Sequence, residues 1–168
     1  MIKRTLNLKA IDISYFLLGP RQVGKSHLIE ATLQPHVWID LLKQGEFLRY
    51  NKNPDSLFDE VQSQITKRPM LVIIDEIQRC PELLNAVHRL MFKYEQIQFV
   101  LTGSSARKLK HGGANLLAGR AWEARLFPLT SHEIKDFNLL RLLNRGGLPE
   151  IYDSADYEED LSSYVLRP

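Results

Sequence analysis

The sequence predicts an α/β fold in which a parallel sheet is covered by helices on both faces, giving three layers. Short apolar runs of strand length alternate along the chain with longer stretches whose apolar residues recur at helical spacing. Most of the short runs are almost wholly apolar, which is typical of parallel strands buried on both sides. No repeat or low-complexity segment interrupts the alternation, so the 168 residues are expected to form one continuous unit.

Five runs are predicted to be strands. In chain order they are residues 13–18, 37–42, 70–74, 97–101 and 121–129. The fifth run alternates apolar and polar residues, as a strand at the edge of a sheet does, and Pro128 interrupts it near its end.

Three helices are predicted between these runs, over residues 24–33, 54–65 and 81–94. Two of them begin with proline followed by acids, the usual start of a helix. The end of the chain has a different character. A short helix capped by Ser131 is expected over 131–136, a turn over 146–149, a solvated acidic linker or helix face over 150–160, and part of a helix over 161–166.

Composition excludes several classes of protein. The net charge of +2 is far from that of a polycation that coats nucleic acid. The single cysteine, Cys80, excludes an internal disulfide framework and a cysteine-based metal cluster. No apolar run approaches the roughly 20 residues of a membrane span, and no long apolar segment follows the basic first residues. We therefore expect a cytoplasmic protein with no membrane partner.

The strongest motif follows the first predicted strand and has the pattern GxxxxGK[ST]. Its glycines let the backbone curl so that N–H groups point at phosphate oxygens, and the helix that follows adds its positive end. Lys25 is expected to reach the β- and γ-phosphates of a nucleotide, and the Ser26 hydroxyl to bind Mg²⁺. His27 lies beside the loop, where a packed or exposed helix residue is the alternative. The predicted nucleotide-binding residues are Gly19, Pro20, Arg21, Gln22, Val23, Gly24, Lys25, Ser26 and His27.

Two acids end the third predicted strand. Asp75 is expected to help hold Mg²⁺, directly or through water. Glu76 can act as a general base for an attacking water, which favours a hydrolase over a kinase. Neighbouring side chains point in different directions at a strand end, so the two acids can do separate work.

Hydroxyl groups follow the fourth predicted strand, at the edge of the sheet where ligands bind. Thr102 or Ser104 is expected to orient the attacking water or to sense the γ-phosphate, and a plain polar turn is the alternative for each. The basic stretch 107–120 follows. A solvated loop is favoured for Arg107, Lys108 and Lys110, whereas the Arg120 guanidinium is a candidate to stabilise the transferring phosphate, in cis or from a neighbouring subunit.

With these residues identified, the chain resembles a family of prokaryotic ATPases in the AAA superfamily, whose members pair an AAA-like domain with a C-terminal domain of unknown function. The resemblance extends over almost the whole chain, in the right order. The segments that carry it are GPRQVGKS (19–26), IIDEIQRCPELL (73–84), LTGSSA (101–106), LLAGRAWEARLFPLTSHE (116–133) and GGLPEIY (146–152).

The resemblance implies a five-stranded parallel sheet of the AAA type of phosphate-loop NTPase, in which the catalytic glutamate lies beside the Mg²⁺ site. It implies ATP and Mg²⁺ as ligands, with Lys25, Ser26, Asp75 and Glu76 in the roles given above. It also makes 101–106 a sensor-like segment, although many AAA proteins carry Asn there, and Arg120 an arginine finger. Residues 1–136 are then the ATPase domain, and 137–168 a C-terminal tail or helical segment, the start of a second region whose remainder is expected to be missing.

Two functions follow from these residues. The first is hydrolysis of Mg²⁺-ATP that drives a conformational change in a partner or in the missing domain. The second is a nucleotide-binding switch or assembly module with little turnover, and a small-molecule kinase is a weaker third. A second copy of the chain or another protein is a candidate partner, and nucleic acid is a weaker one that rests only on Arg107, Lys108, Lys110 and Arg120.

Overall fold

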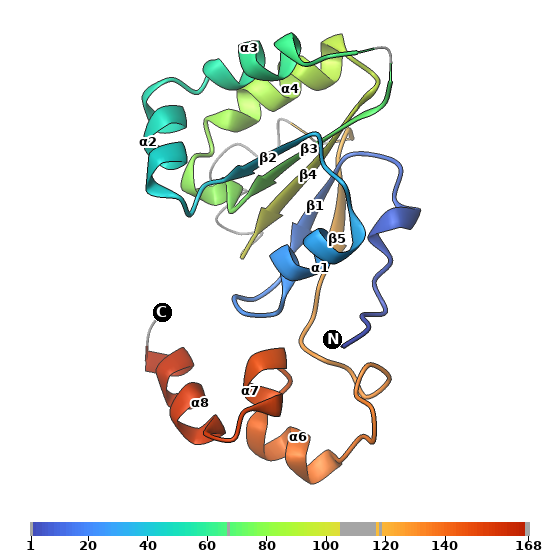
Figure 1. Ribbon diagram of the computed structural model, residues 1–168, viewed down its shortest axis with the longest axis vertical. Helices are drawn as coiled ribbons and strands as arrows, with labels where there is room; N and C mark the ends of the chain where they lie inside the picture. The colour runs from blue at the N-terminus through green and yellow to red at the C-terminus, as the bar shows by residue number, and fades with distance from the viewer. Residues whose placement is uncertain (1, 67, 105–116, 118, 167–168) are drawn as a thin grey trace.

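The computed structural model describes residues 2–66, 68–104, 117 and 119–166, and a five-stranded parallel sheet lies at its centre (Figure 1). The strands lie side by side in the order β2-β3-β4-β1-β5. This confirms the predicted fold class and the position of the fifth run at an edge. The strands are β1 (Tyr15–Leu18), β2 (Val37–Asp40), β3 (Met70–Asp75), β4 (Ile97–Gly103) and β5 (Trp122–Arg125).

The register of the strands brings three loops to one edge of the sheet. Leu18 of β1 pairs with Gly103 of β4, and Ile74 of β3 pairs with Leu101 of β4. All neighbouring strands are parallel, so the loops after β1, β3 and β4 leave from the same end. The predicted phosphate loop, the acidic pair and the hydroxyl segment therefore meet there.

One face of the sheet is covered by α2 (Gln44–Lys52), α3 (Ser56–Ser63) and α4 (Leu83–Lys93), as Figure 1 shows. The apolar residues of α3 and α4 recur at helical spacing, so each helix turns one apolar face to the sheet. This face of the core includes Val72, Ile74 and Phe99 from the strands and Tyr50, Leu57 and Val87 from the helices.

The other face is covered by α1 (Lys25–Thr32) and the short 3-10 helix η1 (Leu8–Ala10). The alternate residues of the strands, such as Leu17 and Ile73, form an apolar cluster with Ile29 of α1, and this cluster continues to Ile151 of α7 (Pro149–Asp153), beyond the end of the sheet (Figure 1). Two further helices, α6 (Leu139–Arg145) and α8 (Tyr157–Leu166), group with α7 at the end of the molecule away from α3 (Figure 1). Part of the region predicted to begin a second domain thus contributes to the core of the sheet.

The predicted elements differ from the structure in two places. Residues 131–136 form turns instead of a helix, because Asp136 has a positive φ of 53° that ends the helical conformation after one turn. The helix α2 has no counterpart in the prediction. The acidic stretch 150–160 lies largely in α7 and α8, the helical alternative given for it, and α6 lies in the C-terminal segment that was expected to be helical. Among the described residues, the helices are too short or too polar to cross a membrane.

Candidate functional site

The loop 19–26 connects β1 to α1, and the geometry of the backbone requires both of its glycines. A Cβ atom on Gly19 would lie 2.2 Å from the backbone oxygen of Leu126, so only glycine allows the loop to pass this close to the chain after β5. Gly24 has a φ of 89°, which L side chains rarely adopt, and it lies directly before the first residue of α1. The loop therefore has the compact shape that the motif predicts.

Lys25 is buried, and its amine lies on the loop itself. Its Nζ donates hydrogen bonds to the backbone oxygens of Gly19 and Pro20, each at 2.9 Å. Burial lowers the pKa of this amine, while the carboxylates of Glu76 and Asp75 act in the opposite direction. The ammonium group is thus placed where phosphate oxygens can replace the two backbone oxygens.

Ser26, Asp75 and Thr102 form a connected set of oxygen atoms. The Ser26 hydroxyl donates to Asp75 Oδ2 at 2.7 Å, and the Thr102 hydroxyl donates to the other carboxylate oxygen. Thr102 is fully buried and also accepts the backbone N–H of Glu76 at 2.9 Å. Its hydroxyl therefore helps to position the two acids, while a contact with water or with the γ-phosphate stays a prediction.

Glu76 lies on a strained backbone beside the cavity. Its φ is 58° and its ψ is 46°, a left-handed conformation that costs energy for a residue with a side chain. The hydrogen bond to Thr102 helps to maintain it. The Glu76 carboxylate accepts a hydrogen bond from Nε2 of Gln78, a residue that the sequence analysis did not single out.

A cavity of about 1120 Å³ opens along the loop, which is enough for a nucleoside triphosphate. Its wall contains residues 21–27 of the loop together with Glu76 and Ser104, all of them predicted site residues. Gly19 and Pro20 take part through the backbone oxygens that bind Lys25, whereas Asp75 lies behind Ser26. The cavity thus brings most of the predicted residues together.

The wall also contains residues that the sequence analysis did not assign to the site. They come from the N-terminal segment, from α1, from the chain after β2, from the short 3-10 helix η2 (Ile77–Arg79) and from α7. The GGLPEIY segment was a signal for the residues of α7, but no local pattern marks those near the N-terminus. The unassigned residues are Ile2, Arg4, Leu28, Ala31, Leu42, Gln78, Arg79, Pro149, Glu150 and Asp153.

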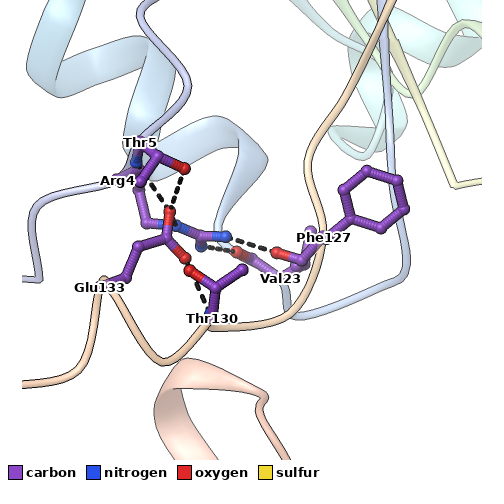
Figure 2. A network of polar contacts seen from close by, with 6 residues as sticks. All are labelled: Arg4, Thr5, Val23, Phe127, Thr130 and Glu133. Carbon is purple, nitrogen blue, oxygen red and sulfur yellow. Dashed lines mark hydrogen bonds and ion pairs between the residues drawn. The ribbon is translucent and has the colours of Figure 1, made fainter.

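A second polar cluster contacts the loop through Arg4, and we call its four residues, Arg4, Thr5, Thr130 and Glu133, the junction (Figure 2). Arg4 Nε donates to Glu133 Oε1 at 3.1 Å, and the two side chains are only 8% and 2% exposed. Arg4 also donates to the backbone oxygen of Val23 at 2.9 Å and to that of Phe127. One guanidinium therefore ties the N-terminal segment to the phosphate loop and to the chain after β5.

The Glu133 carboxylate has hydrogen-bond donors on both oxygens. Oε1 accepts from the N–H of Thr5 at 2.7 Å and from its hydroxyl at 3.0 Å, and Oε2 accepts from the N–H of Thr130 at 3.0 Å. Burial alone would raise the pKa of this carboxyl. The hydrogen bonds from Thr5, Thr130 and Arg4 outweigh burial and lower the pKa to about 2.

Arg120 lies away from the cavity. It precedes β5, and strands begin at the edge of the sheet opposite the phosphate loop. Its guanidinium contacts His88 and lies 5.7 Å from the ring centre of Phe92, both on α4. Arg120 therefore lies away from the cavity of its own chain, and its predicted role as an arginine finger stays a prediction. Arg107, Lys108 and Lys110 lie outside the described residues.

The sequence model of a family described as AAA domain matches residues 13–135. The chain belongs to this family. Membership of this family supports nucleotide binding by the chain. A search of curated protein sequences found no match.

Solved structures show a similar fold. The Walker-type ATPase PABY2304 of Pyrococcus abyssi has a TM-score of 0.61 and 18% identity, over 95% of this chain and 68% of that chain. The Aeropyrum pernix ORC1 protein, in complex with DNA, has a TM-score of 0.48 and 14% identity, over 74% of this chain and 42% of that chain. The ORC2 protein of the same organism has a TM-score of 0.47 and 16% identity, over 73% and 43%. The chain thus spans less than half the length of the two Aeropyrum proteins.

Proposed function

We propose that this AAA domain binds ATP with Mg²⁺ and hydrolyses it. The observation that carries the proposal is the convergence of four side chains at one end of the cavity. Lys25, Ser26 and Glu76 line it, and Asp75 lies behind Ser26 at hydrogen-bond distance. A cation, a hydroxyl and two carboxylates around a phosphate loop are the groups that phosphoryl transfer to water requires.

The residues present fit Mg²⁺. This ion takes oxygen ligands and is bound in proteins by one or two carboxylates together with substrate phosphates. Ser26 Oγ and Asp75 Oδ2 are oxygen atoms 2.7 Å apart beside the phosphate loop, and we propose that they hold the ion. When bound, Mg²⁺ would neutralise part of the charge on the phosphates.

The side chains divide the chemistry between them. Lys25 would exchange its bonds with Gly19 and Pro20 for bonds with phosphate oxygens, which places positive charge where negative charge develops. Glu76 would take one proton from the attacking water. The water oxygen forms a bond to the γ-phosphorus while the bond from that phosphorus to the bridging oxygen breaks, leaving ADP and phosphate.

The nucleoside would lie toward α7. The cavity runs from the phosphate loop to Ile2, Ala31 and the first residues of α7, so a bound nucleotide would contact that helix directly. We propose that this contact transmits the state of the nucleotide to α7 and α8. Slower hydrogen exchange over residues 149–166 on addition of Mg²⁺-ATP would support the coupling, and unchanged exchange there would contradict it.

Thermal unfolding with Mg²⁺-ATP tests nucleotide binding. A ligand at a hundredfold excess over its Kd stabilises the folded state by about 2.7 kcal/mol. For a chain of this length that is a rise in Tm of roughly 5–10 °C. Lys25→Ala should abolish the rise, while Lys52→Ala, at the exposed end of α2, should retain it. No rise in the parent protein would end the proposal.

Phosphate release tests hydrolysis and the role of Glu76. Removal of a general base slows a reaction by about 10²- to 10⁴-fold, so Glu76→Gln should lower turnover by that factor and still bind ATP. Glu95→Gln is the matched control, because Glu95 is exposed and lies outside the cavity wall. Equal rates for the parent and Glu76→Gln would remove Glu76 from the mechanism.

A nucleotide-binding switch with little turnover is the second candidate, and the position of Arg120 favours it. Since Arg120 contacts α4 at the opposite edge of the sheet, it would reach a γ-phosphate only in a second copy of the chain. Phosphate release per chain that rises with protein concentration and falls in Arg120→Ala would indicate such a copy. Tight ATP binding with no release at any concentration would favour the switch.

A further inference from the structure

Gln78 has an unusual position beside Glu76. It lies in the short 3-10 helix η2 (Ile77–Arg79), and its side chain lines the cavity. Its Nε2 donates to the Glu76 carboxylate and lies 3.4 Å from the Ser104 hydroxyl. Its Oε1 is buried and, within the part of the chain that the structure describes, has no hydrogen-bond partner.

An orphan acceptor of this kind requires an explanation. A buried polar atom without a partner costs about 1–3 kcal/mol. Rotating the amide would not relieve the cost, because a carboxylate only accepts hydrogen bonds and Nε2 must therefore face Glu76. The contact with Glu76 thus holds Nε2 against the proposed general base and leaves Oε1 as an acceptor that gains a partner only if the side chain turns toward the cavity.

We propose that Gln78 positions the water that attacks the γ-phosphate, an inference that rests on the hydrolysis proposed above. A water molecule has two hydrogens, so two acceptors are needed to fix its orientation. Because Oε1 is shielded from solvent in the absence of nucleotide, the Gln78 side chain would turn it toward the cavity as the water binds. Glu76 would accept one hydrogen and remove it as the proton, while Gln78 Oε1 would accept the other, which stays on the oxygen. A lone pair of the water is then directed at the phosphorus, and the products are again ADP and phosphate.

The neighbouring residues are less suited to this role. Arg79 also lines the cavity, but a guanidinium only donates hydrogen bonds, and it lies 4.8 Å from the ring centre of Phe47. The other buried orphan among the described residues is the Tyr15 hydroxyl, at the start of β1 and so at the far end of that strand from the loop. Gln78 therefore combines a free acceptor with contact to Glu76.

The test compares Gln78→Leu and the nearly isosteric Gln78→Met with the parent chain. Both variants remove the amide, and the second guards against failure of the first to fold. Misplacement of a reacting group commonly costs tenfold to a hundredfold, so kcat should fall by about that factor while KM and the Kd of ATP change less than about twofold. Gln44→Leu, at an exposed position outside the cavity wall, should match the parent.

A second measurement does not depend on turnover. ADP with aluminium fluoride imitates the transition state together with its attacking water, whereas ADP alone does not. Gln78→Leu should bind ADP as the parent does and bind ADP with aluminium fluoride about tenfold or more weakly. A variant that loses affinity for ADP in the same proportion, or that hydrolyses ATP at the parent rate, would overturn the role of Gln78.

Failure of the proposed ATP hydrolysis would give a different set of results from failure of the role of Gln78. A parent chain that releases no phosphate and binds ADP no more tightly with aluminium fluoride would remove hydrolysis itself, and this inference with it. If the parent is active and Glu76→Gln is not, only the behaviour of the Gln78 variants decides the present inference.

Discussion

Two polar clusters contact the same phosphate loop, and they are built in opposite ways. At the junction, both oxygens of Glu133 are hydrogen-bonded, and the Arg4 guanidinium binds Glu133 and two backbone oxygens. At the edge of the sheet, Gln78 leaves an acceptor free and Lys25 binds backbone oxygens that a ligand could replace. The difference indicates that the junction, whose polar groups are all paired, stabilises the fold. The cluster at the edge of the sheet has polar groups that are available to bind a ligand.

The largest expected effect comes from breaking the junction. Removing one member of a buried ion pair leaves the other charge uncompensated, which typically costs about 3–5 kcal/mol. Arg4→Met and Glu133→Leu should each lower the free energy of unfolding by about that amount, as measured with urea. Arg125→Met is the matched control, because its partner Glu123 and Arg125 itself are exposed, and an exposed pair contributes about 1 kcal/mol or less. Equal losses for the two arginines would contradict the comparison.

The second largest effect is expected at acid pH, which should weaken the junction. The pKa of Glu133 is lowered from 4.5 to about 2, so its stabilisation is present above pH 4.5 and is lost as the pH falls toward 2. Between pH 7 and pH 3 the contribution should fall by about 2 kcal/mol. Urea unfolding at both values measures it as the change in the difference between the parent and Glu133→Gln. A difference that does not vary with pH would show that the carboxylate is not selectively stabilised.

Thr102 offers an intermediate effect at the open cluster. Thr102→Val would leave the Glu76 N–H and one Asp75 oxygen without their partner, at a cost of about 1–2 kcal/mol. The free energy of unfolding and the rate of phosphate release should both fall, because the two acids lose their alignment. Thr102→Ser keeps the hydroxyl and should stay close to the parent in both measurements; a loss as large as that of the valine variant would assign the effect to packing.

The smallest effect is expected at Lys25 without nucleotide. Lys25→Met removes two hydrogen bonds but also relieves the cost of burying an ammonium group, so stability should change by no more than about 1 kcal/mol. Urea unfolding without nucleotide measures the change. A loss as large as that for Arg4→Met would show that the open cluster stabilises the fold as strongly as the junction does, and would remove the contrast between them.

Much of the sheet and of its ligand-binding edge could be predicted from sequence, because their signals are local. Four strands lie in largely apolar runs and the fifth in a run that alternates, the loop 19–26 is a short motif, and Asp75 and Glu76 stand at the end of a buried strand. Parallel topology then places the ends of those strands together. The apolar pattern, the parallel direction of the strands and the family resemblance are enough to predict these features.

The remaining features depend on tertiary contacts that leave no local pattern. Arg4 and Glu133 are 129 positions apart, and neither lies in a motif whose chemistry indicates the other. Thr102 has the sequence context of a loop hydroxyl but is the penultimate residue of β4 and is buried. For 131–136, the inward turn of Glu133 toward the N-terminal segment overrides the helix signal of Ser131.

The junction also has a consequence for the order in which the chain matures during synthesis. Arg4 and the phosphate loop are made early, but the loop can be fixed by Arg4 and Glu133 only after the residue 129 positions beyond Arg4 has left the ribosome. At about 5–20 residues per second, roughly 100 residues separate the loop from that moment, a delay of roughly 5 to 20 seconds. In a nascent chain the phosphate loop should therefore be fixed late, shortly before α7, which completes the wall of the cavity, is synthesised.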